Sequence, residues 1–147
     1  MYQSDCRMIE IKENKITTQE YLEIRAKVGW VALMPEQAER ALKNSLYVVG
    51  AYEDGCLVAM GRVVGDGAVI CYIQDLIVVP ETQRKGIGSI VLKELISYVE
   101  MLRSKGTQMM LCLMCAKGRE AFYEQHGFIA RPNYSLGPGM IQYLKDC

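Results

Sequence analysis

The stretch from Tyr72 to Arg103 constrains the fold most, because it joins an apolar strand to an amphipathic helix through a glycine-rich loop. Residues 72–79 are rich in β-branched side chains and stop at Pro80, which predicts a strand. From Ile87 to about Arg103, apolar residues recur at helical spacing, which predicts a helix. This order of elements presents free backbone N–H groups and the positive end of a helix dipole to an anion.

The loop at residues 83–88 has the sequence QRKGIG. Its two glycines let the backbone bend and come close to a ligand. The spacing differs from the three-glycine fingerprint of dinucleotide-binding proteins, and the Gly-Lys-Ser/Thr of nucleotidase phosphate loops is missing. We therefore expect the loop to bind a pyrophosphate, and the alternative is a tight turn without a ligand.

Length and composition limit the classes of protein to which the chain can belong. The chain has 147 residues, half of them hydrophobic, with 17 Lys+Arg against 17 Asp+Glu. This balance argues against nucleic-acid binding, which needs a basic surface. The sequence has no run of 18 apolar residues and no signal-peptide pattern, so we expect no membrane association and a cytoplasmic location.

The six cysteines are expected to be reduced thiols rather than disulfide partners or metal ligands. Only Cys112 and Cys115 lie close together in the sequence, inside an apolar run that predicts a strand. Residues three apart on a strand point to opposite faces, so these two cannot bind one ion without a bend. We therefore expect no metal site.

Two short helices are predicted before the long one. Thr17 and Glu20 fit a capping box that opens the first helix, which Gly29 ends. Pro35 suits the first turn of the second helix, which ends near Asn44.

Strands are predicted from β-branched runs and from turn residues between them. An Asp-Gly pair and a Gly-Asp-Gly turn separate the central strands, which predicts an antiparallel meander. The last strand of the meander, the long helix and the next strand should form a right-handed parallel crossover. A short helix is expected at about residues 118–125. The predicted strands are residues 8–12, 45–52, 56–64, the run that ends at residue 79, 108–115, 128–130 and 140–144.

Three motifs in this order resemble the GNAT superfamily of N-acetyltransferases. The glycine loop resembles the family's Q/R-x-x-G-x-G/A motif, and residues 75–80 (DLIVVP) resemble its D/E-L-x-V-x-P stretch. Residues 121–128 (AFYEQHGF) resemble its A-x-x-F-Y-x-x-x-G-F segment. The resemblance covers nearly the whole chain and implies a small, bacterial-type single domain over residues 1–147. The implied fold is α/β, with the meander joined to the crossover in a splayed mixed sheet.

The resemblance also implies a reaction, the transfer of an acetyl group from acetyl-CoA to a primary amine by direct attack on the thioester. Family members often carry Arg or Lys at the position of Ser89 and Asn at the position of Lys117. The cofactor-binding residues that the resemblance implies are Leu76, Ile77, Val78, Arg84, Lys85, Gly86, Ile87, Gly88, Ser89, Lys117 and Tyr123.

Tyr123 matches the tyrosine that protonates the CoA thiolate in many relatives. A phenol with a pKa of about 10 is a proton donor at neutral pH. The alternative is a packing tyrosine in an aromatic pair with Phe122 or Phe128. Asp75 is the candidate general base, because an amine must lose a proton before it attacks. Its alternative is a structural carboxylate that accepts hydrogen bonds.

In the family the first two helices wall the acceptor pocket, which here nominates Tyr21, Arg25, Trp30 and Met34. Residues 137–140 are similar to a bacterial and plastid subgroup that includes serotonin-acetylating enzymes, which favours a small aryl- or alkylamine acceptor. Two other functions stay open: an acyl-CoA-binding sensor or interaction module without turnover, and an acetyltransferase of protein amines. Many relatives dimerise through their C-terminal strands, so the resemblance also implies a homodimer.

Overall fold

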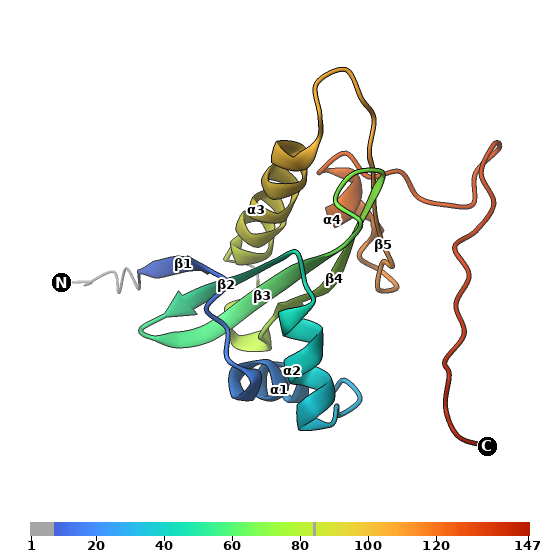
Figure 1. Ribbon diagram of the computed structural model, residues 1–147. Helices are drawn as coiled ribbons and strands as arrows, with labels where there is room; N and C mark the ends of the chain where they lie inside the picture. Colours follow the sequence, from blue (N-terminus) through green and yellow to red (C-terminus); the bar gives the residue numbers. More distant parts are fainter. Residues whose placement is uncertain (1–7, 84) are drawn as a thin grey trace. The chain divides into compact units, whose positions relative to one another are not determined.

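The computed structural model of the protein describes residues 8–83 and 85–147 (Figure 1). Arg84, one of the residues expected in the anion-binding loop, lies outside the described residues. The chain forms two compact units, of which the first ends at Cys112 and the second covers Leu113–Cys147. The elements in chain order are β1 (Ile9–Glu13), α1 (Thr18–Lys27), α2 (Pro35–Lys43), β2 (Tyr47–Glu53), β3 (Cys56–Gly65), β4 (Ile70–Val78), the 3-10 turn η1 (Pro80–Thr82), α3 (Ile87–Leu102), β5 (Met110–Leu113) and α4 (Glu120–Glu124).

Five strands form one mixed sheet in the order β1-β2-β3-β4-β5. The first four pair antiparallel with their neighbours along the chain. Next to β5, the Met110 N–H donates to the Val69 carbonyl at 2.9 Å, and the Cys112 thiol donates to the Cys71 carbonyl at 3.7 Å. These contacts advance in the same direction along both segments, as parallel strands do. The predicted fold class, a meander joined to a parallel crossover, is confirmed.

The core of the first unit lies on both faces of the central strands. β2 is buried along its whole length, because α3 covers one face of the sheet and α1 and α2 cover the other (Figure 1). Val91 and Leu95 of α3 are fully buried. A Cβ built on Gly61 of β3 would come within 2.5 Å of the Leu95 Cδ1 atom, so the glycine lets α3 pack close to the sheet.

The sequence predicted most of the helix boundaries. Thr17 caps α1, and its capping box with Glu20 is present in both directions. Pro35 is the first residue of α2. Among the described residues, no helix combines the length and the apolar character needed to cross a bilayer.

Two predicted strands were wrong. Residues 128–130 and 140–144 form no strand. A strand needs the N–H and C=O groups of a neighbouring strand as partners, and sequence periodicity does not say whether a partner is in reach. Most apolar side chains of these segments are correspondingly exposed, with Met140 at 87%, while Phe128 is half-buried against Tyr123.

Candidate active site

A β-bulge in β4 sets the geometry of the candidate site. The pairing of β3 with β4 shifts between Met60 and Arg62, so that Gly61 faces both Asp75 and Leu76. Asp75 has a φ of 57°, in the left-handed region that few residues other than glycine adopt. Bulges redirect side chains and are frequent beside active sites. Here the bulge turns Asp75 toward α1.

The Asp75 carboxylate binds three side chains from α1 and β3. The Tyr21 hydroxyl of α1 donates to Oδ2. Arg25 Nη1, also from α1, donates to Oδ1 at 2.9 Å, and Arg62 Nε of β3 donates to Oδ2 at 2.7 Å. Asp75 is 3% exposed, and a charge buried this deeply needs such partners. Two guanidinium groups share one carboxylate, so the cluster has an excess of positive charge.

Burial and the Asp75 charge fix the protonation of two of these partners. Burial raises the pKa of Tyr21, and its hydrogen bond to Asp75 raises it further, against smaller opposing effects of the two arginines. Burial alone would lower the pKa of Arg62, but the hydrogen bond and the charge of Asp75 outweigh it and the net shift is upward. Tyr21 is therefore a neutral donor and Arg62 a cation at ordinary pH.

The four residues nominated for the acceptor pocket have different positions. Tyr21 is fully buried, and Arg25 links Asp75 to the α1–α2 connection by donating to the Val31 carbonyl at 3.0 Å. Trp30 is 41% exposed, and the Arg25 guanidinium lies 5.3 Å from its ring centroid. Met34 precedes α2 and is 67% exposed. Asp75 and Arg25 thus connect Tyr21 and Trp30, while no such contact joins Met34 to them among the described residues.

The glycine loop leads directly into α3. Gly86 is the N-cap of α3 with a φ of 77°, a conformation that favours glycine. No atom of its surroundings lies within 4 Å of the place where a Cβ would stand. The first N–H groups of a helix have no acceptor within the helix, so the backbone of Ile87 and Gly88 can bind an anion at this end, and Ser89 follows them in the first turn. Lys85 is exposed beside it.

The end of β4 lies next to this loop in the sequence. The Ile77 side chain is buried, and Leu76 and Val78 are half-buried. Gln83 Nε2 donates to the Val78 carbonyl at 3.0 Å and ties the loop to the strand. The residues expected to face a cofactor in the first unit therefore form one continuous segment.

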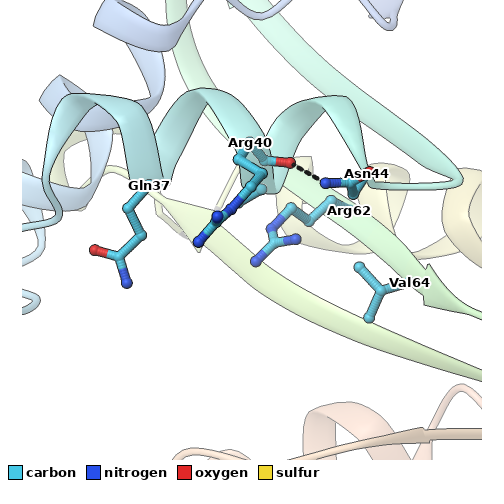
Figure 2. Close-up of a pocket in the computed structure, with 6 residues that line it drawn as sticks. Gln37, Arg40, Asn44, Arg62 and Val64 are labelled. Atoms are coloured by element: carbon cyan, nitrogen blue, oxygen red, sulfur yellow. Dashed lines mark hydrogen bonds between the residues drawn. The ribbon is translucent and has the colours of Figure 1, made fainter. Parts of the chain in front are cut away.

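A pocket of about 400 Å³ opens between α2 and β3 (Figure 2). Its volume lies in the range of small-molecule sites, roughly 300–1,000 Å³. Sequence reasoning missed this pocket. One signal was available, because Arg62 is the only charged residue in the apolar run of residues 56–64, and such a charge needs a partner or a ligand. The residues that line the pocket are Gln37, Arg40, Ala41, Asn44, Arg62 and Val64.

Tyr123 belongs to an aromatic cluster in the second unit. Its ring makes edge-to-face contacts with Phe122, at a centroid distance of 5.1 Å, and with Phe128, at 5.9 Å. Burial raises the pKa of Tyr123, the charge of Cys115 adds to this, and Arg119 opposes it. Among the described residues, the Tyr123 hydroxyl has no hydrogen-bond partner. The aromatic contacts of the ring are those expected of a packing tyrosine. They leave the hydroxyl available to donate a proton.

Lys117 precedes α4 and is exposed. Like Tyr123, it lies in the second unit, whereas the glycine loop and Asp75 lie in the first.

Comparisons with known proteins identify the class of protein. The profile of the Acetyltransferase (GNAT) family matches residues 15–128. A GNAT-family acetyltransferase from Streptococcus pneumoniae is 31% identical and superposes with a TM-score of 0.79, over 95% of this chain and 100% of that chain. The chain belongs to the GNAT family of acetyltransferases, which confirms the resemblance inferred from the three motifs.

Two relatives add detail. An uncharacterised N-acetyltransferase of Pyropia yezoensis is 27% identical over 138 residues, which cover 87% of this chain and 77% of the relative. A chloroplastic serotonin N-acetyltransferase of rice is 30% identical over 119 residues, and these cover 78% of this chain and 58% of the rice protein.

Proposed function

We propose that the protein transfers an acetyl group from acetyl-CoA to the primary amine of a small molecule, with an aryl- or alkylamine favoured. The observation that carries this proposal is the left-handed Gly86 at the start of α3, which follows the bulged strand β4 after the short turn η1. The open space beside Gly86 supports a backbone anion site here, on the segment that follows the strand carrying Asp75. A GNAT-family aminoglycoside N-acetyltransferase, 14% identical with a TM-score of 0.67, was crystallised in complex with CoA.

The residues of the loop fit the cofactor's pyrophosphate. Backbone N–H groups of residues 86–89 would bind it, and Lys85 adds positive charge. When bound, acetyl-CoA supplies the acetyl group as a thioester. The backbone of residues 76–78 would pair with the pantetheine arm and direct an N–H group toward the thioester oxygen.

Two side chains are proposed to move protons. Tyr123 would give its proton to the thiolate that leaves when the amine nitrogen bonds to the acetyl carbon and the carbon–sulfur bond breaks. Asp75 is the candidate that accepts the proton of the amine. Its hydrogen bonds to Tyr21, Arg25 and Arg62 also support the alternative of a structural carboxylate, because a base would first have to release one of these donors.

The rice serotonin N-acetyltransferase supports an arylamine acceptor. The competing functions are an acyl-CoA-binding module without turnover and an acetyltransferase of protein amines. The free Tyr123 hydroxyl favours an enzyme, because a binding module has no need of a proton donor.

The deciding experiment is an assay of thiol release from acetyl-CoA with a panel of amines: tryptamine, polyamines, amino acids, aminoglycosides and a lysine peptide. A blank without acceptor corrects for the protein's own cysteines. Thiol release with a small amine supports the proposal, whereas release with the peptide alone makes the protein a protein acetyltransferase. Tight acetyl-CoA binding without release for any acceptor supports the binding module.

We further propose one N-acetyltransferase domain over residues 1–147, a homodimer and a cytoplasmic location. The family profile crosses the boundary between the two units, which supports one domain. The exposed apolar side chains of the C-terminal segment support a subunit interface there, and these include Ile129, Leu136, Met140, Ile141 and Leu144. Free thiols at Cys56, Cys71, Cys112, Cys115 and Cys147 agree with a reducing compartment.

A further inference from the structure

The pocket between α2 and β3 concentrates positive charge. Residues 37, 40 and 41 of α2 and its C-cap Asn44 line it, and their spacing places them on one side of the helix. Arg40 and Arg62 extend toward the same hollow (Figure 2), which Gln37 also lines, while the Asn44 side-chain amide donates to the Arg40 main-chain carbonyl at 3.0 Å. No Asp or Glu lines the pocket. Because the whole chain has equal numbers of acidic and basic residues, this excess of charge is local.

Arg62 is held in place at the base of the pocket. Its side chain is 13% exposed, its Nε donates to Asp75 at 2.7 Å, and its Nη1 donates to the Ser45 hydroxyl at 3.2 Å. A guanidinium fixed by two partners loses little further entropy when it binds a ligand. Arg40 differs, because it is exposed and forms no ion pair within the described part of the chain. Its charge is available to an anion.

The pocket adjoins the site of the proposed chemistry. Arg62 pairs directly with Gln74 of β4, and Ile77, near the expected thioester position, is three residues further along the same strand. At the rise of a strand, three residues span roughly 10 Å. A small molecule can therefore place an amine at the thioester and another group in the pocket.

We propose that the acceptor amine also carries an anionic group, a carboxylate or a phosphate, which Arg40 and Arg62 bind in this pocket. The guanidinium groups would donate charge-assisted hydrogen bonds to its oxygens, and the amide nitrogen of Gln37 would add a neutral one. The distance along β4 favours an amine and an anion separated by several bonds over an α-amino acid. This inference rests on the proposed acetyl transfer and specifies its substrate class.

The test uses pairs of amines that differ in the anion. β-Alanine is compared with propylamine for the carboxylate, and O-phosphoethanolamine with ethanolamine for the phosphate. We expect kcat/KM to be about tenfold or more higher for the anionic member of at least one pair, since a charge-assisted contact contributes that much. The pair that shows the preference identifies the anion.

Two variants of α2 assign the preference to the pocket. Arg40→Gln should reduce it by about tenfold, mostly through a higher KM for the anionic amine. Lys43→Gln is the matched control, because it removes the same charge from the same helix at a residue that does not line the pocket. Neutral amines that react as well as anionic ones, or equal effects of the two variants, would overturn the proposal.

Absence of thiol release with every amine would refute the proposed function, and binding would then test the pocket alone. O-phosphoethanolamine and β-alanine are titrated by calorimetry into wild-type protein, Arg40→Gln and Lys43→Gln. Weaker binding of either compound to Arg40→Gln alone supports the anion site. Equal binding of both compounds to all three proteins, or none, overturns it.

Discussion

The two units of this chain differ in how completely their apolar surfaces are packed. In the first unit, β2 is buried along its whole length and α3 buries Ile87, Val91, Leu92, Leu95 and Val99. In the second unit, all of which is described, no residue is buried, and the aromatic cluster around Tyr123 is its main packed group. The comparison teaches that periodicity predicts structure reliably where each apolar face finds a partner within the same unit.

The largest effect is expected at the buried carboxylate of the first unit. Asp75→Ala should lower the free energy of unfolding by about 3–5 kcal/mol, because it takes the carboxylate partner from two largely buried guanidinium groups, whose side chains are 12% and 13% exposed. Urea denaturation measures the change. Asp146→Ala, in the exposed end of the second unit, is the matched control and should change stability by less than about 0.5 kcal/mol. Equal losses of unfolding free energy for both variants would mean that the two units do not differ in packing.

In the second unit, a change at Tyr123 should affect catalysis more than stability. Tyr123→Phe should lower kcat about a hundredfold, the usual contribution of a proton donor, and leave both acetyl-CoA affinity and stability nearly unchanged, because the ring remains. Steady-state kinetics and calorimetry measure these quantities. A large loss of affinity with normal turnover would refute the role as acid.

The pH profile provides the control for Tyr123. The phenol donates only while it is protonated, and its pKa is raised above 10.0. Wild-type kcat should therefore not fall through loss of this proton until the pH exceeds that value.

A smaller effect is expected for packing within the aromatic cluster. Phe128→Ala removes the edge-to-face contact with Tyr123 and should cost about 1 kcal/mol, measured by thermal unfolding. Phe128→Leu is the control that keeps an apolar side chain. A loss as large as that of Asp75→Ala would mean that the second unit is packed as tightly as the first.

The smallest effect is expected near the C-terminus. Ile141 is exposed in the single chain, so at low protein concentration, where subunits separate, Ile141→Ser should change the free energy of unfolding by less than about 0.5 kcal/mol. A change that grows at higher protein concentration would support the proposed subunit interface at this segment, and a change that stays small at every concentration would contradict it.

The sequence predicted those features that depend on local pattern. The glycine loop, α3 and the capping box of α1 follow from residue spacing within a few turns. The Asp75 cluster could not be predicted, because Tyr21 and Arg25 lie 54 and 50 residues before Asp75 in the chain and the bulge that brings them together has no sequence signal. The pocket that Arg40 and Arg62 line together was missed for the same reason, because the two residues lie far apart in the sequence.

The Asp75 cluster also has a consequence for the order of folding. Pairing of β3 with β4 brings Asp75 beside Arg62, but Tyr21 and Arg25 arrive only when α1 docks. Until then, burial of the carboxylate is opposed by the loss of its hydration. The sheet and α1 should therefore close in one cooperative step, so that the bulge gains its conformation and the helix its position together.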